Sequence, residues 1–214
     1  MPVRLDPENH RYMQVRLRYE KDRLVEEDGS PVMMQWERGI MRETARALEP
    51  QNRQVLNLGF GMGFIDEAIQ RFGPAKHHIC EPHPDVYAKM VEDGWLHRRG
   101  VKVHHDFWQR VIDELPRFDA IYFDTWDDSV DQFRELVKRL PRLLNPNGLF
   151  SWFNHPVNPE LHDCVGEQGF AISRRRIKVR PPPKADQGNC YYFNSRVRSY
   201  DIVLARQKCA TTRR

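Results

Sequence analysis

The sequence lacks any segment that would serve as a membrane span or a secretory signal. No uninterrupted apolar run approaches the ~20 residues that cross a bilayer, and the first ten residues, MPVRLDPENH, are polar. There is also no internal repeat and no low-complexity stretch. With 214 residues, 40% of them hydrophobic and 30% charged, the chain has the size of one α/β domain and is short for two. These features predict a cytoplasmic globular protein.

Cysteine is scarce, and the cysteines form no recognisable pair. They are Cys80, Cys164, Cys190 and Cys209, with no C-x-x-C spacing. Reduced thiols in a cytosolic protein are the simplest interpretation. Histidine doublets at 77–78 and 104–105 cannot chelate by themselves, because adjacent residues of a strand point to opposite faces. We therefore predict no metal site.

The charge is unevenly distributed along the chain. The net charge is +4, and the basic excess is concentrated at 174–180, at Arg196 and Arg198, and in the C-terminal tail. A basic stripe can bind nucleic acid, but no aromatic-rich RNA-binding motif accompanies this one. We favour an exposed strand and a frayed tail, and keep a nucleic-acid methyltransferase as an alternative.

Short apolar segments alternate with helical ones from residue 54 onward. The expected strands are 54–60, 77–81, 101–106, 118–126, 148–154, 170–179 and 199–206. The expected helices are 32–41, 65–72, 84–94, 108–115, 128–144 (bent or broken near Pro141) and 158–168. This order predicts an α/β fold with a seven-stranded, mostly parallel sheet and helices on both faces. Ligands of such sheets bind at the carboxyl ends of the strands.

The first two strands end in residues suited to a nucleotide. Gly59, Gly61 and Gly63 follow the first strand and would let the backbone approach a ligand closely. The G-x-G-x-x-G fingerprint is incomplete, because its last position is Phe64. Glu81 follows the second strand about twenty residues later, where an acid accepts hydrogen bonds from ribose hydroxyls.

The third and fourth strands end in further acids and aromatics. Asp106 and the pair Phe107–Trp108 could bind an adenine amino group and cover its ring. Asp124 falls at the centre of the sheet edge, and Glu37 lies on the helix before the first strand. If the first and fourth strands are neighbours, both acids can face one pocket.

Two carboxylates around one site suit a guanidinium group. Its planar donors form bidentate pairs with carboxylates. A guanidinium is not nucleophilic while protonated, and its pKa exceeds about 12. Methylating it therefore requires a base, and a carboxylate hydrogen-bonded to the reacting N–H is placed for that role.

Five motifs, in the same order along the chain, show a family resemblance. They are "VMMQWERGIM", "VLNLGFGMGFID", "HHICEPHPDVYAKMVEDGW", "FDAIYFDTW" and "LLNPNGLFSWFN", with a weaker match in "PPPKADQGNCYYF". The chain resembles the guanidinoacetate N-methyltransferases and the related delta-nitrogen (type IV) arginine N-methyltransferases over about residues 12–154. The first and third motifs look closer to the arginine-directed branch.

The resemblance implies a Rossmann-like class I methyltransferase fold, S-adenosyl-L-methionine as the methyl donor, and a guanidino acceptor. It implies Glu37 and Asp124 as catalytic residues that hold the guanidino group. The substrate residues it implies are Glu37, Asp124, Trp126, Asn154 and His155. The cofactor residues it implies are Tyr12, Met33, Met41, Gly59, Phe60, Gly61, Met62, Gly63, Glu81, Pro82, Phe107, Trp108 and Asp124.

The domain boundaries follow from these assignments. Residues 1–31 are an N-terminal extension that could close over the site as a lid, 32–208 form the methyltransferase domain, and 209–214 are a flexible tail. The absence of a recognisable protein-docking domain favours a small guanidino substrate over arginine within a protein. L-Arginine, methylated at its delta nitrogen, is the first choice and guanidinoacetate the second. The oligomeric state cannot be read from the sequence.

Three departures from the family pattern bear on the site. The acid that methyltransferases often carry two residues before the first glycine is Asn57 here, and the family's usual tyrosine after "DT" is Trp126. The loop after Asn154, "HPVNPE", matches neither branch. A nucleic-acid methyltransferase is disfavoured because the N-P-P-[YF]-type motif is absent. A non-catalytic binding module is disfavoured because both acids are present.

Overall fold

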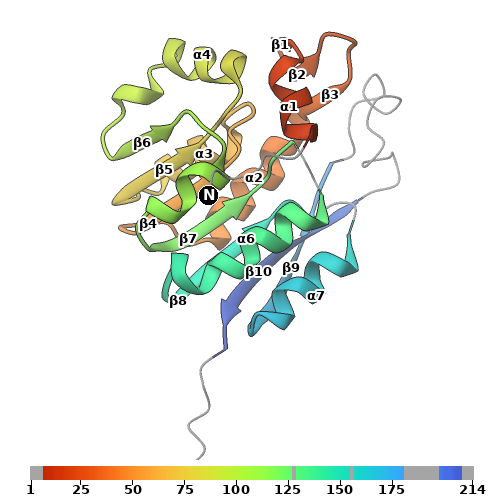
Figure 1. Ribbon diagram of the computed structural model, residues 1–214. Coiled ribbons are helices and arrows are strands. Elements are labelled where there is room, and N and C mark those ends of the chain that lie inside the picture. Colours follow the sequence, from red (N-terminus) through yellow and green to blue (C-terminus); the bar gives the residue numbers. More distant parts are fainter. Residues whose placement is uncertain (1–6, 127–128, 155–156, 181–197, 209–214) are drawn as a thin grey trace, which may run out of the picture.

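The computed structural model describes residues 7–126, 129–154, 157–180 and 198–208 (Figure 1). The predicted site residue His155 and the predicted tail at 209–214 lie outside these ranges. Two sheets make up the β structure.

The larger sheet has seven strands in the order β6-β5-β4-β7-β8-β10-β9. The strands are β4 (Gln54–Leu58), β5 (Lys76–Cys80), β6 (Val101–His104), β7 (Phe118–Phe123), β8 (Leu144–Trp152), β9 (Phe170–Lys178) and β10 (Ser199–Gln207). All neighbours are parallel except β10, which runs antiparallel to both β8 and β9. The predicted seven-stranded, mostly parallel sheet is therefore confirmed, and β4 lies beside β7 as expected.

Helices cover both faces of this sheet. They are α2 (Arg38–Ala47), α3 (Phe64–Arg71), α4 (Pro84–Glu92), α5 (Trp108–Val111), α6 (Val130–Leu143) and α7 (Pro159–Glu167), with short 3-10 turns at Trp95–His97 and Ile112–Glu114. One core joins α5, α6 and α7 to the sheet, and a second core joins α2, α3 and α4 to the other face. Alternating side chains of β4 supply both cores, Leu56 the first and Val55 the second.

The N-terminal segment forms a helix and a small sheet of its own. It consists of α1 (Pro7–Gln14), β1 (Leu17–Tyr19), β2 (Arg23–Glu26) and β3 (Pro31–Met34), the last three being consecutive antiparallel neighbours. In Figure 1 this unit is red to orange, and the arrowhead of β7 points toward α1. Buried side chains from the unit, among them Tyr12, Leu17 and Leu24, join the α2–α4 core.

The predicted helix over 32–41 is wrong for its first half. Residues up to Met34 pair with β2, a 3-10 turn spans Gln35–Glu37, and the helix begins only at Arg38. Met33 and Met34 are both buried although they are adjacent in the strand. Apolar residues at 32, 33 and 36 fit helical spacing, but two buried neighbours fit a strand with both faces covered equally well.

The predicted break at Pro141 does not occur. Pro141 lies in the last turn of α6, which continues to Leu143. Proline has no N–H to donate to the carbonyl four residues earlier, so α6 continues to Leu143 with one hydrogen bond fewer. Arg117 donates to the carbonyls of Pro141 and Leu144, which satisfies acceptors that a helix end leaves open. No helix among the described residues is long and apolar enough to cross a membrane.

Candidate functional site

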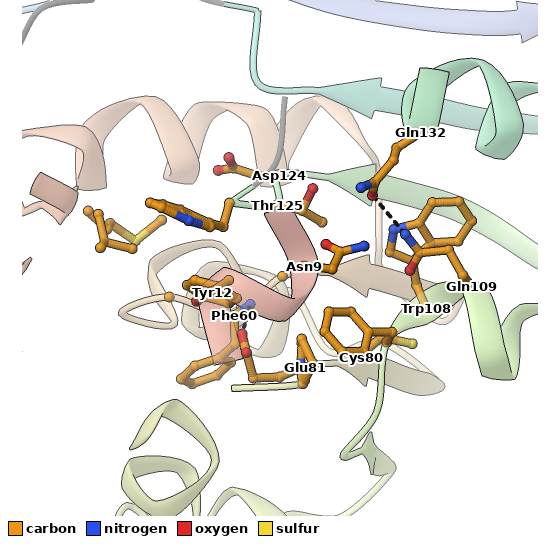
Figure 2. A pocket seen from close by; sticks show the side chains of 17 residues that line it. Asn9, Tyr12, Phe60, Cys80, Glu81, Trp108, Gln109, Asp124, Thr125 and Gln132 are labelled. Carbon is orange, nitrogen blue, oxygen red and sulfur yellow. Dashed lines mark hydrogen bonds between the residues drawn. The ribbon is translucent and has the colours of Figure 1, made fainter. Parts of the chain in front are cut away.

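A pocket opens at the carboxyl ends of β4, β5 and β7 (Figure 2), and its space, including the part open to solvent, is about 700 Å³. It is lined by Asn9, Tyr12, Val32, Met33, Gly59, Phe60, Gly61, Cys80, Glu81, Pro82, Phe107, Trp108, Gln109, Asp124, Thr125, Trp126 and Gln132. In the view of Figure 2, Asp124 and Thr125 lie on one wall and Cys80 and Glu81 on the opposite one, with Asn9 between them. The position is the one that the sheet topology predicts for a ligand.

The glycine-rich turn after β4 has the close packing that only glycine allows. Gly59 has a φ of +95°, and a Cβ there would lie 2.0 Å from the carbonyl oxygen of Asp124. Gly63 begins α3 at a φ of +68°, and its Cβ would lie 2.5 Å from the Phe60 ring. A side chain at position 59 would force the ends of β4 and β7 apart, and one at position 63 would displace the Phe60 ring. The turn leaves backbone exposed to the pocket, as a bound nucleotide requires.

Glu81 is a buried carboxyl at the end of β5. One of its oxygens accepts from the Phe60 N–H at 2.9 Å, and the other accepts from the His83 N–H at 2.8 Å. Burial raises the pKa of Glu81 to about 7, although these N–H bonds and one from Gly61 oppose the rise. The carboxyl is therefore fixed in orientation and keeps lone pairs for a ligand donor.

The N-terminal unit covers the pocket. Tyr12 of α1 stacks on Trp126, with ring centroids 5.1 Å apart and planes inclined by 25°. Three hydrogen bonds hold the segment after α1 to the core: His83 Nε2 to the Val15 carbonyl (2.9 Å), the Leu17 N–H to Asp85 (2.8 Å), and the Tyr19 hydroxyl to the Gly61 carbonyl (2.6 Å). The last of these fastens the unit directly to the glycine turn.

The two predicted catalytic acids occupy different positions. Asp124 lines the pocket, whereas Glu37 lies outside the lining, is only 3% exposed, and accepts from the Met34 N–H at 2.8 Å. Both carboxylates nevertheless raise the pKa values of Tyr122 and Tyr200, whose shifts are dominated by burial. The two acids therefore lie within electrostatic range of the same pair of hydroxyls, and the Tyr122 hydroxyl lies 3.4 Å from Asp124 Oδ2.

Several predicted site residues support the pocket from outside its lining. Met41 Sδ lies 3.4 Å from the Tyr122 hydroxyl, the Met62 N–H contacts Met33 Sδ, and Gly63 is the N-cap of α3. Asn154 is 3% exposed, and its side chain contacts the Asp201 carbonyl and His162. The structure thus places Asn154 in a link between β8, β10 and α7.

The structure adds lining residues that the sequence did not single out. They are Asn9, Val32, Cys80, Gln109, Thr125 and Gln132. Val32, Cys80, Gln109 and Thr125 each adjoin a predicted site residue, so adjacency is a signal for them. Asn9 and Gln132 reach the pocket only because α1 and α6 fold against it, and no local signal marks them.

Two buried polar atoms in the lining suit an absent ligand. Asn9 Nδ2, a donor, and Gln109 Oε1, an acceptor, are buried and have no hydrogen-bond partner among the described residues. The Gln109 amide nitrogen donates to Gln132 at 2.7 Å, which fixes the side chain (Figure 2). Buried polar groups are rarely left unpaired. Together with the glycine turn and Glu81, these atoms fit a ligand that carries both donors and acceptors, as an adenosyl group does.

This chain is similar to several known proteins. The family described as guanidinoacetate N-methyltransferase matches residues 9–163. Protein arginine N-methyltransferase 2 of Aspergillus oryzae is 42% identical over 197 residues, covering 85% of this chain and 47% of the relative. The same-named protein of Aspergillus fumigatus is 41% identical over 190 residues, covering 81% and 45%. The chain therefore spans about half the length of the curated relatives it matches.

A solved structure supports the fold. The precorrin-6y C5,15-methyltransferase of Geobacter metallireducens has a TM-score of 0.60 and 15% identity, covering 83% of this chain and 90% of its own. This likeness confirms the class I methyltransferase fold that the sequence predicted. The family match extends over more than half of the chain and includes both acids and the glycine turn. On these grounds the chain belongs to the guanidinoacetate N-methyltransferase family.

Proposed function

We propose that this chain transfers a methyl group from S-adenosyl-L-methionine to a nitrogen of a guanidino group. The observation that carries the proposal is Asp124, a carboxylate at the centre of the sheet edge and in the pocket wall, in a chain of this family. We take L-arginine, at its delta nitrogen, as the first acceptor to test and guanidinoacetate as the second. The relatives are named for protein arginine, so arginine within a protein is a third.

The lining residues divide between the two ligands of this proposal. Glu81 would accept from the ribose hydroxyls, Phe107 and Trp108 would enclose the adenine, and the turn from Gly59 to Gly63 would hold the methionine part. Pro82 and Met33 would complete the cofactor side of the lining, and Met41 and Met62 would support it from outside the lining. The cofactor supplies an electrophilic methyl group on a sulfonium when bound.

Asp124 and Glu37 have the chemistry needed for the acceptor. Carboxylates bind a guanidinium through charge-assisted hydrogen bonds and hold one nitrogen in a fixed direction. Asp124, in the pocket wall, would accept the proton that the attacking nitrogen must lose. Glu37 would supply the second negative charge from its buried position. The Trp126 ring, stacked on Tyr12, already has a cation over it, because the Arg11 guanidinium lies 5.1 Å from its centroid.

The chain itself also supports a reducing compartment. Cys80 and Cys164, the two cysteines among the described residues, are both buried free thiols. Burial raises the pKa of Cys80, which lines the pocket, so the thiol is unreactive. These observations agree with a cytoplasmic location.

The test is methyl transfer measured by mass spectrometry with three acceptors side by side: L-arginine, guanidinoacetate and a protein extract. We expect methylated product from at least one of them. Asp124→Asn should abolish most of it, while Asp131→Asn, at an exposed α6 acid that pairs with Arg134, should not change it. Calorimetric binding of the cofactor with no transfer to any guanidino compound would refute the proposal.

A further inference from the structure

A buried polar network lies beneath the glycine turn. It consists of Asn57 on β4, Asp66 on α3 and His77 on β5, and all three side chains are fully buried. None of them lines the pocket. Asn57 occupies the position where methyltransferases often carry an acid, and its partner in this network is an acid, Asp66.

The Asn57 amide joins a carboxylate to the glycine turn. Its Nδ2 lies 2.7 Å from the Gly59 carbonyl and 2.9 Å from each carboxylate oxygen of Asp66. Only an amide can do this, because an NH₂ group has two protons to donate and a carboxylate at position 57 would have none. Asn57 Oδ1 is buried without a hydrogen-bond partner among the described residues, so it can accept from a further donor.

The burial of Asp66 is unfavourable by itself and requires a reason. Asp66 is the third residue of α3 after its N-cap Gly63, where an acid usually interacts with the helix dipole while exposed to water. Here the side chain is 0% exposed, and His77 Nε2 lies 3.1 Å from one of its oxygens but not in hydrogen-bonding geometry. A buried carboxylate is tolerated when donors surround it, but the helix dipole alone does not explain its complete burial.

Asp66 is connected with the pocket mainly by contact, through Asn57, and to a lesser extent by charge. It is one of the groups that raise the pKa of Glu81, and Glu81 lines the pocket. Its hydrogen-bond partner Asn57 also contacts the carbonyl of Gly59, another lining residue. The hydrogen bonds of Asn57 therefore connect Asp66 with the site, and the electrostatic effect of Asp66 on Glu81 is a minor addition.

We propose that Asp66, acting through the Asn57 amide, is a positioning residue for the methyl donor: it fixes the Gly59 turn and supplies beneath it the negative charge that position 57 lacks. The donor's methionine end carries an ammonium, a sulfonium and a carboxylate, so its net charge is positive. The inference rests on the proposed function only in taking S-adenosylmethionine as the ligand. It does not depend on which acceptor is methylated.

The first test is calorimetric titration of S-adenosylmethionine, without acceptor, into Asp66→Asn. The new amide can still accept from Asn57, so the variant removes the charge and keeps the pair. We expect the Kd to rise about tenfold, because a charge-assisted contact becomes a neutral one, with a melting temperature close to that of wild type. The matched control is Glu67→Gln, the next residue of α3, an acid that pairs with Arg38 instead; its Kd should not change.

The second test exchanges the pair, as Asn57→Asp with Asp66→Asn. The exchange returns a charge to position 57 and lets the amide now at position 66 donate to it, but leaves the Gly59 carbonyl without its donor. We expect a Kd between those of wild type and Asp66→Asn, because the charge is restored while the Gly59 carbonyl has lost its donor. Asn57→Asp alone should be strongly destabilised, because it places two carboxylates against each other in the core.

Each outcome bears on the proposal. A folded Asp66→Asn with wild-type Kd would overturn it and leave the network a purely structural feature. If that variant does not fold, the exchange variant decides: a Kd within about tenfold of wild type supports the proposal, and a loss of about a hundredfold overturns it. A wild-type chain that binds the cofactor but methylates no guanidino compound would refute the proposed function alone.

Discussion

Glu37 and Asp124 are two carboxylates in range of the same two hydroxyls, those of Tyr122 and Tyr200. Glu37→Gln keeps an acceptor for the Met34 N–H, and Asp124→Asn keeps the shape of the wall. We expect each to lose about 2–4 kcal/mol of transition-state stabilisation, roughly thirtyfold to a thousandfold in kcat/KM, with cofactor affinity nearly intact. The double variant should lose less than the sum, since both act on one group.

This prediction separates two roles of Glu37. Its bond to Met34 ends β3 and begins the turn before α2, so a structural role alone is a real alternative. A merely structural Glu37 would give Glu37→Gln near-normal turnover, since glutamine preserves the acceptor. Steady-state kinetics on the folded variant distinguish the two.

Tyr122 is a buried hydroxyl that contacts Asp124 from the same strand. Burial, reinforced by the charge of Asp124, raises the pKa of Tyr122, so the hydroxyl remains a donor. Tyr122→Phe removes a donor that favours the ionised carboxylate, and the acid limb of the kcat/KM profile should therefore move to higher pH. Tyr87→Phe, a ring stacked on His105, is the control. An unshifted acid limb in Tyr122→Phe would show that this contact does not tune Asp124.

At the scale of elements, the N-terminal unit is held to the core through contacts that border the pocket. The Tyr12–Trp126 stack and the Tyr19 bond to Gly61 both involve lining residues. Ligand binding should therefore stabilise the unit against local opening. We expect trypsin to cleave after Arg11 and Arg16, both exposed, several-fold more slowly when cofactor and acceptor are present. Tyr12→Ala should speed cleavage. Equal rates with and without ligands would argue against a lid.

The same N-terminal unit contains strands that the sequence patterns do not predict. Strands β1 to β3 are three or four residues long and lie in a charged segment, so they give almost no periodic signal. Strand β3 also crosses the predicted boundary between residues 31 and 32, because Met33 is shared between the small sheet and the pocket. Longer strands such as β7 can be predicted from the sequence, because burial on both faces gives them a continuous run of apolar residues.

At the scale of the whole molecule, the order of strands and helices predicted the sheet, and the sheet predicted where the pocket lies. Gly59, Glu81 and Asp124 follow neighbouring strands, so their convergence is a property of the topology. Asn9, Gln132 and the Asn57–Asp66 pair were not predicted. Their roles arise from contacts between elements distant in the chain or from a pairing between a strand and a helix, which no local spacing encodes.

The free energy of unfolding of the whole protein should depend on pH through the ionisation of Glu81. Its pKa is about 7 when folded, against an ordinary 4.5, so between these values the folded chain holds a proton that the unfolded chain releases. Stability from this group is complete below pH 4.5 and is lost as pH rises through 7, by about 3 kcal/mol. His78, whose pKa burial lowers to about 4, contributes the opposite slope. The difference between wild type and Glu81→Gln therefore isolates Glu81.

Urea denaturation at several pH values between about 5 and 8 tests this prediction. Glu81→Gln should match wild type near the acid end of this range and exceed its stability near the alkaline end, because glutamine never acquires the buried charge. Saturating S-adenosylmethionine should narrow the gap at the alkaline end, since ribose hydroxyls would donate to the ionised carboxylate of wild type and not as well to the amide. Parallel curves for the two proteins would show that Glu81 has the same pKa folded and unfolded. A gap that the cofactor leaves unchanged would remove Glu81 from the cofactor site.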